Sequence, residues 1–456
     1  MVNRRVLTPF ERDLWMVQSA APESTPYNLC MAFELRGSLD EQALAAAVDS
    51  VVARHAALRS VFPTVAGSPW CVVADAASAS ALPAAIPVEG GSQERARILL
   101  DHWTGEPFDL ARGPLFRARL IRLAAEHHVL VVGVHHIVAD GASMEIIWEE
   151  ILSAYEAGAG GSGPPVDHQE SLLPADVHAP LPGDDGGELE RYWAKRLVPL
   201  GSGRPLSLEV GAPPAGEPTV AEMSCGLDTG EKCRELAREE RTSVFVVVLT
   251  AFMIFLYRWA EPSPVVVATP VDVRLDPSAE RNVGLHINLL PVIAVINRTD
   301  PFRAVVRRTR NAFLKDLSYA ALPFGKIAEL AGGRQAPDCH ALAQATFQMV
   351  AGHWTADCTG LEISPFLLSP AALARYPPAA RRRTAADFAI QVWMRGDVVL
   401  SGTLRTSAHI SQNAAALAAD FSRTVSDLLS APDVALGELD GLGSRGNGPL
   451  RHGALD

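Results

Sequence analysis

The stretch that decides the fold is VLVVGVHHIVADG, at residues 129–141. Its first six residues, 129–134, are apolar without interruption, which is typical of a strand buried on both faces in the interior of a sheet. We expect the chain to leave this strand through a short polar turn and to enter a helix over about residues 142–155. Asp140 can cap the N-terminus of that helix with its carboxylate.

The polar turn contains His135, His136, Asp140 and Gly141. Because side chains alternate between the two faces of a strand, the two histidines point to opposite faces, and only one of them can enter a given pocket. This argues against one metal ion held by both. Taken alone, a histidine pair at a strand end is more often structural than catalytic, and such an aspartate is more often a cap than a functional acid. The turn itself leaves both interpretations open.

Around this stretch the hydrophobic pattern predicts mixed helices and strands. In the first half, residues 31–36 and 115–123 read as strands, and apolar residues at three- and four-residue steps predict a helix that starts after Ser38. Residues 158–187 are crowded with Gly and Pro and predict a linker or long surface crossing. The pattern after it is again mixed, with helices near 188–197, 243–258 and 302–319 and strands near 264–270, 287–296, 343–350 and 387–394. Two α+β halves are the economical description.

Length and composition limit the class of protein. A chain of 456 residues is too long for one small core and suggests more than one domain. Forty basic and fifty-two acidic residues give 40 − 52 = −12, so no nucleic-acid partner is expected, since phosphate binding needs clustered Lys and Arg. The hydrophobic share of 48% argues against disorder. We expect a soluble globular protein.

The cysteines and the apolar runs also favour a soluble globular protein. No two of the six cysteines form a CxxC pair, which argues against a zinc site and against a disulfide framework. Residues 244–257 read VFVVVLTAFMIFLY, but this run is shorter than the ~20 residues that cross a bilayer, so it predicts a buried core helix and no membrane partner. Charges near the N-terminus interrupt any signal-peptide core. A cytoplasmic location is expected.

On its motifs the chain resembles the condensation-domain family of nonribosomal peptide synthesis, within the chloramphenicol acetyltransferase-like superfamily. HHIVADG stands where that family has HHxxxDG. The other family blocks follow in order, and the resemblance runs from about residue 6 to about residue 430. These blocks are LTPFERDLW (7–15), RHAALRSVF (54–62), FDLARGPLFRARL (108–120), TPVDVR (269–274), NVGLHINLLPV (282–292), SYAALPF (318–324) and ATFQMV (345–350).

The resemblance implies an α+β fold of two chloramphenicol acetyltransferase-like lobes, which form a V-shaped pseudo-dimer around a central tunnel. The lobes are expected at residues 1–175 and 176–440, with residues 441–456 as a disordered tail. Phosphopantetheine arms of carrier proteins would enter the tunnel from opposite ends and meet at His136. The chain itself is expected to bind no cofactor and no metal, because conversion of a thioester to an amide is downhill.

The implied reaction moves an acyl or aminoacyl group from the thioester of a donor acyl or peptidyl carrier protein to an amine, or to an alcohol. The acceptor is a second carrier protein or a small diffusible amine or alcohol, and the setting is natural-product or antibiotic biosynthesis. His136 is the expected catalytic residue, either as general base or as a positioning hydrogen-bond partner. A neutral imidazole suits this role, because its pKa of about 6.5 is close to that of an α-amine.

Five residues are expected to support the site by resemblance. Asp140 orients the site by pairing with Arg274, and this pair ties the two lobes. His135 packs outside the pocket with a bond to backbone. The Gly141 amide points at the developing oxyanion. Asn288 has two open interpretations, a position at the lobe junction or a strand residue bonded across to a loop.

Three other points stay open. His286 is either a tunnel-lining residue or, more commonly, a core histidine. The run Arg381–Arg382–Arg383 either meets an acidic carrier protein or lies in a solvated loop. The chain is expected to be a free-standing, monomeric enzyme, with an excised synthetase domain as the alternative. The functional alternatives are an acyltransferase that uses acyl-CoA or polyketide carrier proteins, a non-catalytic recruiting module, and an epimerising relative.

Overall fold

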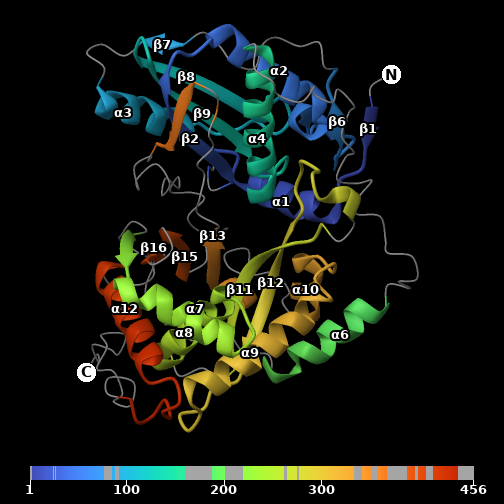
Figure 1. Cartoon of the computed structure of the whole chain (residues 1–456). Helices are drawn as coiled ribbons and strands as arrows, with labels where there is room; N and C mark the ends of the chain where they lie inside the picture. The colour runs from blue at the N-terminus through green and yellow to red at the C-terminus, as the bar shows by residue number, and fades with distance from the viewer. Residues whose placement is uncertain are drawn as a thin grey trace, which may run out of the picture. The chain divides into compact units, whose positions relative to one another are not determined.

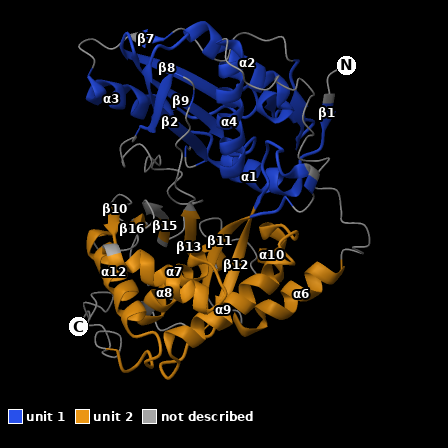
Figure 2. Cartoon of the chain, viewed as in Figure 1, with its two compact units in different colours: residues 1–183, 272–287, 354–380 blue, residues 184–271, 288–353, 381–456 orange. Residues whose placement is uncertain are grey.

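The computed structural model forms two compact units, described separately below (Figures 1 and 2). Unit 1 holds residues 1–183, 272–287 and 354–380, and unit 2 holds residues 184–271, 288–353 and 381–456. The predicted lobes were contiguous, whereas unit 1 also takes in two later segments. The described residues are 3–23, 25, 27–75, 85–87, 92–159, 187–200, 219–260, 264–274, 277–332, 341–350, 358, 360–366, 388–395, 399–406 and 414–439.

Unit 1 is built on a five-stranded sheet in the order β14-β2-β9-β8-β7. β7 pairs with β8 in parallel, and the other neighbours are antiparallel. The bounds are β2 Asn28–Gly37, β7 Ile86–Pro87, β8 Phe116–Ala124, β9 His127–His135 and β14 Leu361–Pro365. Shorter strands are β1 Asn3–Arg5, β3 Ser60–Val61, β4 Thr64–Val65, β5 Ser68–Pro69 and β6 Cys71–Val73.

Helices cover both faces of this sheet (Figure 1). Alternate β9 residues Leu130 and Val132 pack in one core with α2 and α4, whereas Val129 and Val131 pack in a second core with α3. Burial on both faces explains why the β9 sequence is continuously apolar. The helices of unit 1 are α1 Pro9–Ala20, α2 Glu41–Arg54, α3 Gln93–Thr104 and α4 Gly141–Gly158.

Unit 2 contains a six-stranded sheet in the order β10-β16-β15-β13-β11-β12. β13 lies between β11 and β15 and is parallel to both. The strands are β10 Thr219–Ser224, β11 Val265–Asp272, β12 Ile287–Ala294, β13 Ala345–Val350, β15 Phe388–Arg395 and β16 Val399–Thr406. The helices are α6 Gly187–Leu197, α7 Leu227–Glu239, α8 Val244–Ala260, α9 Phe302–Leu317, α10 Phe324–Leu330 and α12 Ala414–Ser430.

The apolar run at residues 244–257 forms most of α8, and its side chains are buried against the sheet, α9 and α12. The predicted core helix is confirmed, because neighbours within unit 2 cover it. Among the described residues no single helix has the length and apolar character of a membrane span, although α7 and α8 meet that criterion as a pair bent by 107°.

The α+β class is confirmed in both units. Among the described cysteines, Cys71, Cys225, Cys233 and Cys358 are buried, Cys30 is partly exposed, and all five are free thiols. Several predictions fall outside the described residues: most of the predicted linker, the tail at 441–456, and the arginine run at 381–383. Those stay predictions.

Candidate functional site

The turn at residues 135–141 joins β9 to α4 and is fixed by backbone hydrogen bonds. The His135 amide donates to the Leu115 carbonyl at 2.9 Å, and the His136 amide donates to the Tyr27 carbonyl at 2.7 Å. Both histidines are therefore held by the chain segments on either side of β9.

His135 is fully buried, and its Nδ1 accepts a hydrogen bond from the Ile137 amide at 3.1 Å. Its ring lies 6.3 Å from the Tyr27 ring and 6.0 Å from the Phe108 ring, measured between centroids. Burial, with a smaller contribution from His136, lowers the pKa of His135 to about 3. The ring is neutral at physiological pH and holds the turn in place.

His136 is partly exposed, unlike its neighbour. Its Nδ1 is buried and has no hydrogen-bond partner among the described residues. Burial lowers the pKa of His136, and the Asp140 carboxylate and the backbone of His136 and Ala139 partly offset that shift. The result is an imidazole that is mostly neutral at neutral pH and can accept a proton.

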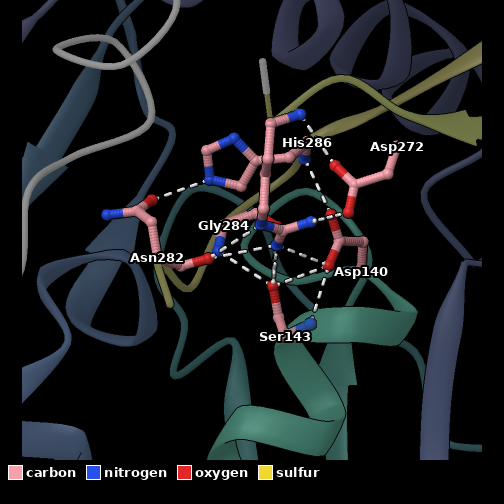
Figure 3. Close-up of polar contacts among 7 residues, drawn as sticks. Asp140, Ser143, Asp272, Asn282, Gly284 and His286 are labelled. Carbon is pink, nitrogen blue, oxygen red and sulfur yellow. Dashed lines mark hydrogen bonds and ion pairs between the residues drawn. The ribbon is translucent and has the colours of Figure 1, made fainter. Parts of the chain in front are cut away.

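Asp140 is the centre of a buried polar network (Figure 3). Its Oδ1 accepts from the Ser143 amide at 2.8 Å, the Ser143 hydroxyl at 2.7 Å and Arg274 Nη2 at 2.8 Å, and its Oδ2 accepts from the His286 amide at 2.9 Å. Burial alone would raise the pKa of Asp140, but Arg274 and Ser143 outweigh it and lower the pKa. This carboxylate stays charged and has both oxygens occupied, so it suits orientation better than proton transfer.

Arg274 joins Asp140 to the segment 272–287. Besides Asp140, its guanidinium donates to the Asn282 carbonyl at 3.0 and 3.2 Å and to Asp272 Oδ2 at 3.0 Å. The ion pair that the resemblance implies is therefore present, but both partners belong to unit 1. The expectation that this pair ties the two lobes is wrong, because the segment packs onto α4 within unit 1.

Ser143 is a network residue that sequence reasoning missed. Its hydroxyl oxygen accepts from Arg274 Nη2 at 2.9 Å and from the Gly284 amide at 3.1 Å, and it lies 3.0 Å from the Gly284 carbonyl. The sequence held one indication of this role. Ser143 follows the capping Asp140 by three residues and stands inside the predicted helix, although Ser is not a strong helix former.

His286 is buried inside the same network. Its Nε2 lies 2.7 Å from Asn282 Oδ1 (Figure 3). Its carbonyl accepts from the Val273 amide at 2.8 Å. These contacts favour the core-histidine interpretation.

Gly141 is exposed at the start of α4, and a Cβ added there would meet no atom within 4 Å. Packing within the described residues therefore does not require glycine at this position. As the first helical residue, its amide has no partner within the helix.

Asn288 lies in unit 2 and is not part of the Asp140 network. Its Nδ2 donates to the carbonyls of Ala320 at 2.8 Å and Leu322 at 2.7 Å, and its Oδ1 accepts from the amides of Leu289 and Phe324. Asn288 thus fastens the turn before α10 to β12. This supports the interpretation of a strand residue bonded across to a loop.

Comparison with known proteins places these features in a family. The sequence model of the condensation domain matches residues 3–450. One linear gramicidin synthase protein from Brevibacillus parabrevis is 30% identical over 330 residues, which cover 70% of this chain and 4% of that protein. Chondramide synthase from Chondromyces crocatus is 28% identical over 344 residues, which cover 70% of this chain and 8% of that protein. The chain thus spans only a small fraction of these curated relatives.

Solved structures show the same fold. The X-domain from teicoplanin biosynthesis has a TM-score of 0.76 at 23% identity, over 95% of this chain and 97% of that one. The first condensation domain of the calcium-dependent antibiotic synthetase, solved with a substrate analogue, has a TM-score of 0.76 at 21% identity, over 96% and 99%. With the family match over nearly the whole sequence, the HHIVADG turn and its polar network belong to a member of the condensation-domain family.

Proposed function

We propose that this chain transfers an acyl or aminoacyl group from the phosphopantetheine thioester of a carrier protein to an amine, forming an amide. An alcohol acceptor would give an ester by the same steps. The observation that carries this proposal is His136. It is a partly exposed imidazole with a lowered pKa, and its Nδ1 has no hydrogen-bond partner in the described part of the chain. The turn that carries it has an Asp140 carboxylate with both oxygens already hydrogen-bonded.

The reaction needs a base or a positioning partner at the attacking nitrogen. The amine attacks the thioester carbonyl carbon, a C–N bond forms, and the C–S bond breaks to release the phosphopantetheine thiol. His136 accepts the proton that the amine loses and returns it to the thiolate, or it holds the amine by a hydrogen bond. General-base catalysis contributes about 10²–10⁴ in rate. Positioning contributes through correct alignment of the reacting atoms.

Other groups of the turn support this step. The Gly141 amide is the proposed donor to the oxyanion, since preorganised N–H groups stabilise a tetrahedral intermediate. Asp140 and Arg274 act at a distance from the reacting atoms, because each is occupied by the network around Ser143.

A second candidate function is a non-catalytic module that recruits a partner protein. The fold likeness to an X-domain favours it, because one solved X-domain is in complex with OxyB. The intact turn favours catalysis, because a recruiting module has no need for a proton acceptor beside a buried, satisfied Asp140. An acyltransferase that uses acyl-CoA or a polyketide carrier protein would share the same turn.

The test is intact-protein mass spectrometry of a loaded carrier protein incubated with candidate amines and alcohols. Loss of the donor with formation of an amide or ester, abolished by His136→Ala, supports a condensation enzyme. Carrier-protein or partner binding without turnover by any donor would favour the recruiting module. Acyl-CoA as the only accepted donor would favour the third candidate.

A further inference from the structure

Asn28 and His135 are directly opposite in the antiparallel pair β2 and β9. Residues in register share one face of the sheet, and their Cβ atoms lie about 4.5–5.5 Å apart. Both side chains also reach the C-terminal end of α3 or the chain after it: Asn28 donates to the carbonyls of Thr104 and Glu106, and the His135 ring contacts Phe108.

The hydrogen-bond roles of both side chains are fixed by backbone groups. His135 Nδ1 accepts from the Ile137 amide, so the proton of the neutral ring is on Nε2. Asn28 Nδ2 donates to two carbonyls, at 3.1 and 2.9 Å, so the amide cannot be turned over and its remaining group is the acceptor Oδ1.

One donor and one acceptor are left over. His135 Nε2 and Asn28 Oδ1 are both buried, and neither has a hydrogen-bond partner among the described residues. Buried polar groups in native proteins are nearly always paired, with protein or with ordered water. The two groups are chemically complementary, yet they do not bond to each other directly.

Neighbouring side chains cover part of the surroundings of the pair, and the Asn28 side chain as a whole is partly exposed. The Arg117 guanidinium lies 3.9 Å from the centre of the Phe108 ring and donates to the Pro107 carbonyl at 2.8 Å. Trp103 packs on Gly133, where a Cβ would come within 3.3 Å of the indole. These contacts hold the loop after α3 beside His135, where Nε2 of His135 and Oδ1 of Asn28 are buried.

We infer that one bound water molecule bridges His135 Nε2 and Asn28 Oδ1, and that Asn28 is a positioning residue for His136. The water accepts from Nε2–H and donates to Oδ1, which gives it two of the two to four partners that a buried water makes. The connection then runs from the loop after α3 through Asn28 and the water to His135, and through Ile137 to the turn that carries His136. The water site needs only the geometry above, whereas its effect on turnover rests on the proposed function.

A high-resolution crystal structure of the full chain tests the water directly. We expect one ordered water about 2.7–3.2 Å from both His135 Nε2 and Asn28 Oδ1. A direct hydrogen bond between these two atoms, or no density between them, would overturn the inference. This readout does not depend on activity, so it stands apart from the test of the proposed function.

A double-mutant cycle tests the positioning role. Asn28→Leu removes Oδ1, and His135→Asn removes Nε2–H while keeping an acceptor near the Ile137 amide. We expect Asn28→Leu to lower kcat roughly ten- to hundredfold with little change in KM, because misplacement by about 1 Å costs up to that much. In the His135→Asn background the same substitution should have little further effect. Independent, multiplicative effects would show that Asn28 acts only through the loop, and would overturn the positioning role.

Cys30→Ala is the matched control. Cys30 lies on the same strand and the same sheet face, opposite Gly133. It should leave kcat unchanged and the water in place. A loss of kcat in the control equal to that of Asn28→Leu would show that any change on this face has the same effect, and would overturn the specific role of Asn28.

Discussion

Arg274 Nη2 donates to Asp140 Oδ1 at 2.8 Å, across 134 residues of sequence. Both side chains are buried, with 5% and 0% exposed. The pair fixes the segment 272–287 to the N-terminus of α4, directly after the turn that carries His136. The geometry of the turn therefore depends on a residue that is remote in the chain.

Removal of either partner should destabilise unit 1. Arg274→Ala leaves a buried, unpaired Asp140 carboxylate, and the loss of one member of a buried ion pair costs about 3–5 kcal/mol. The free energy of unfolding in urea measures it. Arg281→Ala is the control, because Arg281 and Glu149 are 56% and 63% exposed, and such surface pairs contribute about 0–1 kcal/mol. Equal stability of the two variants would contradict a structural ion pair.

The same pair predicts a pH dependence of stability. The pKa of Asp140 is lowered in the folded state by Arg274 and Ser143, against the effect of burial. The stabilisation is therefore complete above the unfolded-state pKa, near 3.9, and is lost as pH falls through the lower folded-state pKa. Urea unfolding between neutral and acid pH should show the wild-type advantage over Asp140→Asn shrink toward acid pH. An advantage that grows on acidification would contradict the assigned direction.

Ser143→Ala should disturb the network without removing a charge. The Gly284 amide and one Arg274 contact lose the hydroxyl, and a buried group left unpaired costs about 1–3 kcal/mol. Thermal unfolding measures the change. Ser430→Ala serves for comparison, since that exposed serine only bonds back within α12 and its loss should stay within about 0.5 kcal/mol. An unchanged melting temperature for Ser143→Ala would show that the Ser143 hydroxyl does not stabilise the network around Asp140.

Gly141→Ala separates packing from substrate approach. No described atom lies within 4 Å of the added Cβ, so the melting temperature should not fall. If substrate passes close to the Gly141 amide, kcat/KM should drop at least about tenfold. This loss is smaller than the loss of rate expected when an oxyanion-hole donor is removed completely. Wild-type kinetics in this variant would remove Gly141 from the proposed site.

The pH–rate profile reports on His136. Burial lowers its pKa, so the neutral ring should persist below the ordinary value of about 6.5. Since the proposed mechanism uses the neutral ring, activity should rise with pH on an acid limb whose midpoint lies below that value. A midpoint clearly above it would show that His136 is stabilised in its charged form.

Much of unit 1 around the turn could be predicted from local sequence. The apolar run before His135 and the capping Asp140 predict β9 and α4, because strand burial and helix capping are local effects. The Asp140–Arg274 pair came only from family resemblance, since no periodicity connects residues that far apart. The role of Ser143 depends on Gly284 and Arg274, which reach it only in the folded chain.

Other features needed the structure for the same reason. β14 pairs with β2 in the unit 1 sheet, although the two strands are remote from each other in the sequence. A lobe predicted as one continuous range of residues therefore did not include β14. Asn288 looked equally suited to the site and to a loop anchor, and only its hydrogen bonds to backbone separate the two. The pairing of Asn28 with His135 is likewise a consequence of strand register.

The most direct test of His136 as the catalytic residue is the fate of a loaded carrier protein mixed with candidate amines and alcohols, followed by intact-protein mass spectrometry. We expect loss of the acyl donor and a new amide or ester with the wild-type chain, and a fall in rate of about 10²–10⁴ with His136→Ala. Undiminished turnover in the His136→Ala variant would contradict this role.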